Sequence, residues 1–196
     1  MRRINLKVLL HTCCAPCSIM CIETLRKENI EPTCFWYNPN IHPFQEYKKR
    51  KKTLIDYTDE IDVKLIIENE YGLREFIDNI YPNFDNRCGV CYNMRLFETA
   101  KYAKEKGFDA FTTTLLISPY QDHDLMCMIA KAAGKKYDIE FLYRDFRPYF
   151  NEGQEKAIKL NLYRQNYCGC IFSEEERFSK KRRKELINKQ KEKELL

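Results

Sequence analysis

Cysteine is the residue type in this sequence with the most potential for chemistry, and ten occur in 196 residues. Most of them fall in three short groups, Cys13-Cys14-Ala15-Pro16-Cys17, Cys88-Gly89-Val90-Cys91 and Cys168-Gly169-Cys170. The apolar stretch near the N-terminus is too short for the core of a signal peptide, so we expect a cytoplasmic protein. In a reducing compartment, grouped cysteines indicate metal or redox chemistry more often than structural disulfides.

The first two groups are compatible with several kinds of chemistry. Cys14 and Cys17 follow a predicted strand and open a predicted helix, which is where redox dithiols lie because a helix N-terminus favours the thiolate. With Cys88 and Cys91 they would form a four-cysteine zinc site. Residues 18–87, 70 in number, separate the two pairs, whereas a zinc ribbon has about 15–20 between its pairs. Neither interpretation uses Cys13.

An iron–sulfur cluster would use Cys13, because each iron takes its own thiolate and adjacent cysteines can reach different irons. Cys88 and Cys91 would then complete the four ligands. Helix N-termini and the nearby cations Arg87 and Arg95 would offset the negative charge of the thiolates. Spacing alone leaves the cluster, the zinc site, dithiol chemistry and unligated thiols all open.

The third group is of a different kind. A disulfide between residues i and i+2, here Cys168 and Cys170, closes a small and strained ring, and strained disulfides tend to be catalytic or regulatory. Gly169 supplies the backbone freedom that such a loop needs. A pair of free thiols on a loop is the alternative. Cys34 and Cys127 stand alone in apolar segments, and we expect them to be ordinary core side chains.

Short apolar segments alternate with amphipathic ones along the chain. We predict strands at 8–10, 33–37, 63–67, 110–116 and 139–143, and helices at 16–28, 44–58, 71–80, 89–106, 119–133 and 151–164. This alternation predicts an α/β fold with a parallel sheet of about five strands and helices on both faces. We expect a single α/β catalytic domain over 1–172, carrying the metal site, and a charged helical tail over 173–196.

In such a sheet, ligands bind beyond the carboxyl ends of the strands. Cys13 follows the first predicted strand, Ser118 the fourth and Asp145 the fifth, so the unusual residues gather at one edge. Gly107 and Gly134 are expected to end the helices that precede them.

The composition excludes some classes of protein. With 44% hydrophobic and 13% aromatic residues, the chain can build a packed core. It contains no run of 18 apolar residues, so we expect no membrane span. A net charge of +5 permits a nucleic-acid partner without requiring one. We predict phosphate contacts from the basic runs at 48–52 and from Lys180 onward, with solvated helix faces as the alternative.

Six ordered motifs between residues 9 and 173 resemble those of the cobalamin-independent epoxyqueuosine reductase family, QueH. They are LLHTCCAPCS (9–18), YNPNIHP (37–43), RCGVCY (87–92), TTTLLISPY (112–120), DFR (145–147) and YRQNYCGC (163–170). The resemblance implies a Rossmann-like fold of the nucleotide α-hydrolase (HUP) kind. It also implies two-electron reductive removal of the epoxide oxygen of epoxyqueuosine at the tRNA wobble position, the last step of queuosine biosynthesis.

The resemblance further implies the residues of the site. A [4Fe-4S] cluster would be bound by Cys13, Cys14, Cys88 and Cys91, and a redox-active disulfide would join Cys168 and Cys170. A mononuclear iron beside the cluster is also implied. By residue type and predicted position, its candidate ligands are His11, Cys17, Asp122 and Asp145. The implied partners are tRNA bearing epoxyqueuosine and an electron donor whose identity the sequence does not reveal.

Two other functions compete with this one. A thiol–disulfide oxidoreductase would be colourless and would depend on Cys14 and Cys17. A zinc-stabilised RNA-binding module would hold stoichiometric zinc and unfold in chelators. Cys13 separates both from the cluster hypothesis, which is the only one to use it.

Overall fold

A sheet of five parallel strands forms the centre of the computed structural model, which describes residues 6–194 apart from the side chains of residue 189 and residues 192–194. The strands are β1 (Val8–His11), β2 (Thr33–Trp36), β3 (Leu65–Ile67), β4 (Ala110–Thr113) and β5 (Glu140–Phe141), in the order β3-β2-β1-β4-β5. β1 is central and completely buried, as expected for a parallel strand covered on both faces. The predicted α/β class and parallel sheet are confirmed.

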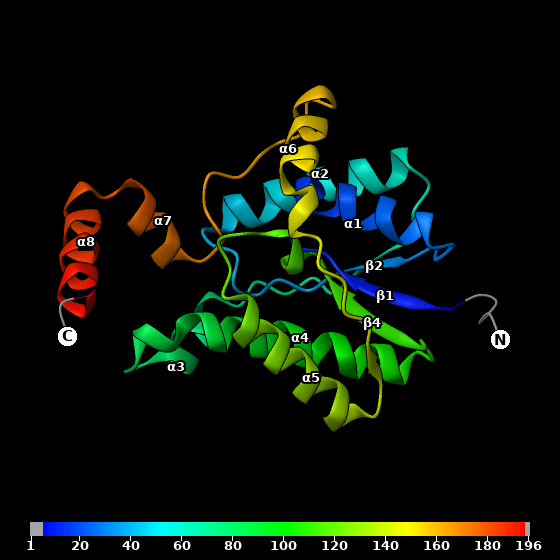
Figure 1. Cartoon of the computed structure of the whole chain (residues 1–196), viewed down its shortest axis with the longest axis horizontal. Coiled ribbons are helices and arrows are strands. Elements are labelled where there is room, and N and C mark those ends of the chain that lie inside the picture. The colour runs from blue at the N-terminus through cyan, green and yellow to red at the C-terminus, as the bar shows by residue number, and fades with distance from the viewer. Residues whose placement is uncertain (1–5, 195–196) are drawn as a thin grey trace.

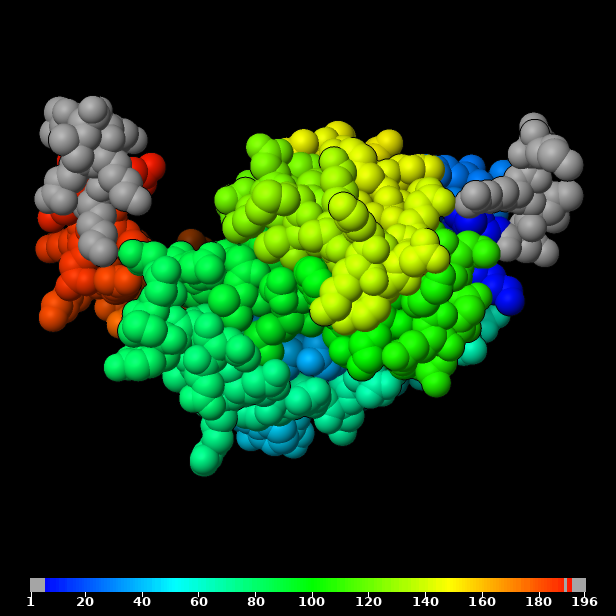
Figure 2. All heavy atoms as spheres, turned by 90° about the horizontal axis from the view of Figure 1, so that it is seen from below, coloured from blue at the N-terminus to red at the C-terminus, as the bar shows by residue number. Residues whose placement is uncertain are grey.

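Helices cover both faces of this sheet (Figure 1). α1 (Ala15–Lys27), α2 (Phe44–Glu60) and α6 (Phe150–Lys159) lie on one face, and α3 (Leu73–Ile80), α4 (Arg87–Glu105) and α5 (His123–Tyr137) lie on the other. Figure 2 shows the latter face, where the green and yellow-green segments from α3 to α5 form most of the surface. Large apolar side chains of the strands, among them Leu9, Phe35 and Phe111, are fully buried between the two layers.

The last two helices lie at one end of the molecule, on the left of Figures 1 and 2. They are α7 (Ile171–Phe178) and α8 (Lys180–Glu194). The ring of Phe172 on α7 lies 5.5 Å from that of Phe84 in the segment before α4, and Glu176 pairs with Arg87. A domain boundary at residue 172 stays a prediction, and it would fall inside α7. Over the described residues, no helix has the length and apolar character that crossing a membrane requires.

The fourth strand is shorter than predicted. β4 ends at Thr113, and residues Thr114–Ile117 form a turn of 3₁₀ helix. The side chain of Thr113 accepts a hydrogen bond from the backbone N–H of Leu115 (3.1 Å), which caps this turn in place of a further strand pairing. The consequence is that Thr114 Oγ1 lies against Cys13 and accepts from its backbone N–H (3.1 Å).

Two helix ends also differ from the prediction. Gly134 does not end α5, which continues to Tyr137. Its lack of a side chain instead allows the carbonyl oxygen of Ile139 to approach, since a Cβ there would lie 2.7 Å from that oxygen. α6 ends at Lys159 rather than at 164, and Asn161 then adopts a left-handed φ of 52°.

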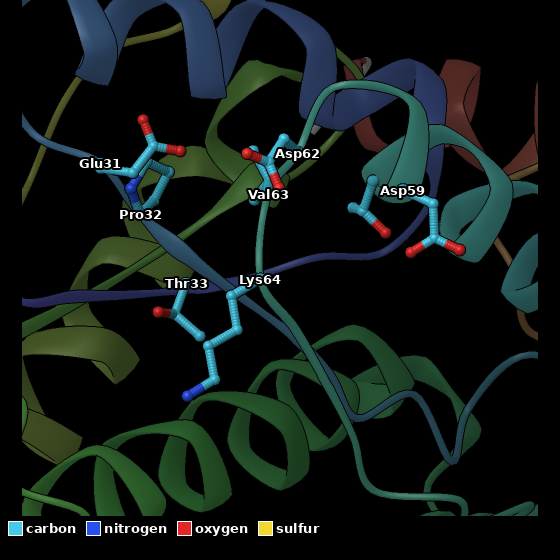
Figure 3. A pocket seen from close by; sticks show the side chains of 8 residues that line it. Glu31, Pro32, Thr33, Asp59, Asp62, Val63 and Lys64 are labelled. Carbon is cyan, nitrogen blue, oxygen red and sulfur yellow. The ribbon is translucent and has the colours of Figure 1, made fainter.

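An open cavity of about 430 Å³ lies at the amino-terminal edge of β2 and β3 (Figure 3). Acidic side chains line it, and one of them, Glu31, is already paired with Arg26 at 2.9 Å. The cavity is at the edge of the sheet opposite to the cysteines that follow β1, so it is separate from the site described next.

Candidate metal centre

Three cysteine sulfurs meet directly after β1. The Sγ atoms of Cys13, Cys14 and Cys17 all lie within 4.8 Å of one another, and all three residues are buried. We call these residues the cysteine triad. Cys14 is the extended N-cap residue of α1, so the free N–H groups of the first helical turn favour negative charge at these sulfurs. Among the described residues, this is the one group of three such side chains with the spacing of metal ligands.

Hydrogen bonds arrange the triad and its charge. Thr114 Oγ1 accepts from the Cys13 backbone N–H (3.1 Å) and donates to Cys13 Sγ (3.4 Å), while Gln165 Nε2 donates to Cys14 Sγ (3.0 Å). Hydrogen bonds with the Cys14 and Cys17 thiols lower the pKa of Cys13. Burial raises the pKa of Cys14. Cys13 is therefore the most acidic of the three thiols.

The second cysteine pair lies in the first turn of α4. Cys91 is buried and Cys88 is exposed. α4 begins at Arg87, two residues earlier than predicted, so both cysteines are inside the helix. Burial raises the pKa of Cys91 to about 12. Since thiolates rather than thiols bind metals, a cation must displace this proton when it binds.

The loop before α7 carries the third group. Cys168 is exposed, and the buried Cys170 is the N-cap residue of α7. Gly169 has a φ of +155°, which favours glycine, and a Cβ there would lie 3.3 Å from the side chain of Ile41. Cys170 and Cys91 belong to one small apolar cluster. The structure thus places the third group beside the second pair.

His42 holds this loop through its backbone and its ring. Its backbone N–H donates to the carbonyl oxygen of Gly169 (2.8 Å), and its carbonyl oxygen accepts from the hydroxyl of Tyr167 (2.6 Å). The ring nitrogen Nδ1 accepts from the backbone N–H of Ile171 (3.4 Å). Burial lowers the pKa of His42 to about 4, so the ring remains a neutral acceptor near pH 7.

Arg50 holds the same loop from α2. Its guanidinium donates to the carbonyl oxygens of Cys168 (2.8 Å) and Tyr167 (3.0 Å) and to Glu46 Oε1 (2.6 Å). The side chain is only 1% exposed. The prediction that the basic run 48–52 faces phosphates is therefore wrong for Arg50, because this residue points inward.

The four candidate ligands for a second iron differ in their availability. Of these, within the described residues, Cys17 alone lies among other ligand atoms. Asp122 caps α5 by accepting from the N–H of Leu125 (3.0 Å), and Asp145 is paired with Arg147 (2.7 Å).

His11, the fourth candidate, has both ring nitrogens engaged. Its Nδ1 lies 2.9 Å from Thr113 Oγ1, and its Nε2 lies 3.3 Å from Arg95 Nε and 3.2 Å from the carbonyl oxygen of Tyr37. Burial, followed by the charge of Arg95, lowers the pKa of His11 to about 3. The ring is thus neutral and serves to hold its neighbours.

The sequence did not predict that Thr114 and Gln165 contact the cysteines. It also did not distinguish the roles of Arg87 and Arg95. Thr114 lies within the predicted strand 110–116, and Gln165 lies just after the predicted helix 151–164, outside every predicted element. Arg87 and Arg95 had equal standing as cations, but Arg87 is neutralised by Glu176 at 2.6 Å. No local pattern carries these contacts, because each partner lies far away in the chain.

Comparison with known proteins identifies the family. The family model described as "Epoxyqueuosine reductase QueH" matches residues 8–176. The epoxyqueuosine reductase QueH of Dehalococcoides mccartyi is 39% identical over 174 residues, which cover 89% of this chain and 96% of that protein. The protein of the same name from Thermotoga maritima is 34% identical, with 88% and 93% covered.

The fold has a solved counterpart. A predicted subunit of a tRNA methyltransferase from Methanocaldococcus jannaschii matches with a TM-score of 0.50 and 12% identity, covering 77% of this chain and 74% of that one. At this identity the likeness concerns the fold alone. The family match and the relatives cover nearly the whole α/β region, so this chain belongs to the epoxyqueuosine reductase QueH family.

Proposed function

We propose that this protein removes the epoxide oxygen of epoxyqueuosine at the wobble position of tRNA in the cytoplasm, the last step of queuosine synthesis. The observation that carries the proposal is the buried cysteine triad at the carboxyl end of β1, in a chain of this family. Two electrons and two protons balance the reaction, which breaks two C–O bonds and yields an alkene and water.

We propose that Cys13, Cys14, Cys88 and Cys91 bind a [4Fe-4S] cluster. The donor set fits, because sulfur ligands select iron–sulfur clusters and each pair lies at a helix N-terminus, where negative charge is favoured. The bound cluster would supply electrons one at a time. The chain's own part is to bury most of these sulfurs and to hold them with Thr114 and Gln165.

We propose Cys17 as the protein ligand of an iron beside the cluster. Its sulfur lies within the triad, but the four proposed cluster positions do not need it. A Lewis-acidic ion in this place would stabilise the negative charge that develops on the epoxide oxygen. His11, Asp122 and Asp145 each have hydrogen-bond or ion-pair partners in the fold, which favours Cys17.

We propose Cys168 and Cys170 as the redox-active pair. The loop is held at three consecutive residues by His42 and Arg50, and Gln121 Nε2 donates to Cys168 Sγ (3.1 Å). Cys170 also packs in one apolar cluster with Cys91. An external reductant would reach Cys168 first, because Cys168 is exposed and Cys170 is buried.

Replacing Lys48 and Lys49 by glutamine is expected to weaken tRNA binding. Both are exposed on α2, and the contacts found for them are the rings of Phe44 and Tyr163. If each contacts a phosphate, the slope of log K against log salt should fall by about 0.7–0.9 per lysine. Titration of tRNA at several salt concentrations measures this slope.

Lys52→Gln is the matched control, since its charge is already paired with Asp56 at 2.9 Å. An unchanged slope in the Lys48→Gln/Lys49→Gln variant would remove this part of α2 from the tRNA interface and leave the helical tail from Lys180 as the proposed contact.

The experiment that tests the proposed function is the iron, acid-labile sulfide and zinc content of protein purified without oxygen, followed by turnover of tRNA bearing epoxyqueuosine. We expect about four sulfides and four or five irons per chain in a brown protein that dithionite bleaches. Conversion of epoxyqueuosine to queuosine with a chemical reductant should follow. A colourless protein with one zinc would support the RNA-binding module instead, and a colourless protein without metal would support the dithiol enzyme.

A further inference from the structure

One buried cation near the cysteines lacks a carboxylate partner among the described side chains. Arg95 on α4 is 2% exposed. Its guanidinium donates to Asn38 Oδ1 (2.8 Å), to His11 Nε2 (3.3 Å) and to Cys91 Sγ (3.5 Å). Among the side chains that the structure describes, no carboxylate oxygen forms an ion pair with it. Its charge is therefore balanced only when a sulfur beside it is a thiolate.

The other two arginines of the site show the contrast. Arg50 has Glu46 at 2.6 Å and Arg87 has Glu176 at 2.6 Å, so the charge of each is neutralised within the fold. Burying a charge without a partner is strongly unfavourable. A protein keeps such a residue when a bound group supplies the opposite charge.

The surroundings hold the Arg95 guanidinium in place. Asn38 Nδ2 donates to the carbonyl oxygen of Thr12 (2.9 Å), which turns its Oδ1 toward Arg95. The neutral His11 ring accepts from Nε on the other side. His11 is the last residue of β1, and Asn38 lies two residues after the end of β2. The carboxyl edge of the sheet therefore fixes the position of the Arg95 guanidinium.

The position of the guanidinium relates the two metal-binding segments. Arg95 Nη1 donates to the sulfur of Cys91 (3.5 Å), and its Nε lies 3.3 Å from His11, which ends β1 two residues before Cys13 and its sulfur. These two sulfurs come from the helix α4 and from the end of β1. The cation thus lies where thiolates from both segments would meet.

We propose that Arg95 is a positioning residue that supplies the fixed positive charge for an anionic, thiolate-bound metal centre held by Cys13 and Cys91. This inference rests on the proposed function. A cluster bound by four thiolates carries net negative charge, and reduction makes it more negative. A fixed cation beside it strengthens metal binding and makes the one-electron reduction easier, which is what an enzyme that must reduce an epoxide requires.

The test compares Arg95→Met and Arg95→Lys with the wild type in metal-loaded and metal-free protein. In the loaded protein, Arg95→Met should lose metal to a chelator about 10–100-fold more readily, as is typical when a group that supports metal ligands is removed. Its midpoint reduction potential should move to more negative values. Arg95→Lys keeps the charge and should fall between the two.

The metal-free protein should respond differently. Because Arg95→Met removes an unpaired buried charge, the free energy of unfolding in urea should stay the same or rise. A purely structural arginine would show the reverse pattern, with a less stable metal-free protein and an unchanged potential. The matched control is Arg87→Met combined with Glu176→Gln, which removes two opposite charges beside Cys88 and should leave the potential unchanged.

The outcomes separate this inference from the proposed function. A wild-type protein without an iron–sulfur cluster would overturn the proposed function. If that protein held zinc on the same cysteines, comparing zinc retention by the wild type and by Arg95→Met would still test the role of Arg95. A wild-type protein with a cluster, together with an Arg95→Met variant of unchanged metal retention and potential, would overturn the role of Arg95 alone.

Discussion

Replacing Cys13 by serine is expected to abolish both iron–sulfur cluster binding and reductase activity. Cys13 is the member of the triad whose pKa is lowered, and it receives a hydrogen bond from Thr114. A serine hydroxyl cannot replace the thiolate that iron requires. Iron and acid-labile sulfide in anaerobically purified protein should fall to near zero, and turnover of tRNA bearing epoxyqueuosine should be lost with them.

Two further variants make this result specific. Cys127→Ser changes a half-buried cysteine of α5 outside all three groups, and it should retain cluster and activity. Cys17→Ser should keep the sulfide content and lose one iron if Cys17 serves the second metal. Retention of sulfide and activity by Cys13→Ser would exclude the proposed ligand set and indicate a cluster bound by other cysteines. Activity that is retained without sulfide would favour a dithiol enzyme that uses Cys14 and Cys17.

Replacing Arg50 by glutamine is expected to lower the free energy of unfolding by about 3–5 kcal/mol, the usual cost of removing one partner of a buried ion pair. Glu46, 9% exposed, would remain buried without its cation. The loop around Gly169 would lose its two hydrogen bonds from the guanidinium. Urea unfolding of the metal-free protein measures the stability, and turnover at a temperature where the variant remains folded measures the effect of the looser loop.

The same helix provides the control for this prediction. Lys52 and Asp56 form an exposed ion pair on α2 at the same four-residue spacing as Glu46 and Arg50. Lys52→Gln should change the free energy of unfolding by only about 0.3–0.5 kcal/mol, because exposed pairs of this kind contribute little. If Arg50→Gln and Lys52→Gln lowered the free energy of unfolding by the same small amount, Arg50 would not be what stabilises the loop.

Local patterns in the sequence were enough to predict the fold class. Runs such as Val8–Leu10 are apolar because a central parallel strand is buried on both faces, and this signal needs no knowledge of neighbours. The rule that ligands bind beyond the carboxyl ends of strands then placed Cys13 and Cys14 at the correct edge. Strand and helix ends were less accurate, as at Thr113 and Gly134, because hydrogen bonds from side chains and packing with other segments decide them.

The tertiary structure alone decided which cations belong to the site. The sequence presents Arg50 as one of five consecutive basic residues, yet its contacts with residues 167 and 168 turn it inward. Arg87 and Arg95 lie on one helix beside the same cysteine pair, but among the described side chains a carboxylate pairs with Arg87 alone. The ordered motifs and the apolar segments of the sequence already indicated the family, the parallel sheet and the edge at which the grouped cysteines lie. Burial and charge pairing join residues that are far apart in the chain, so only the packing of the whole fold decides them.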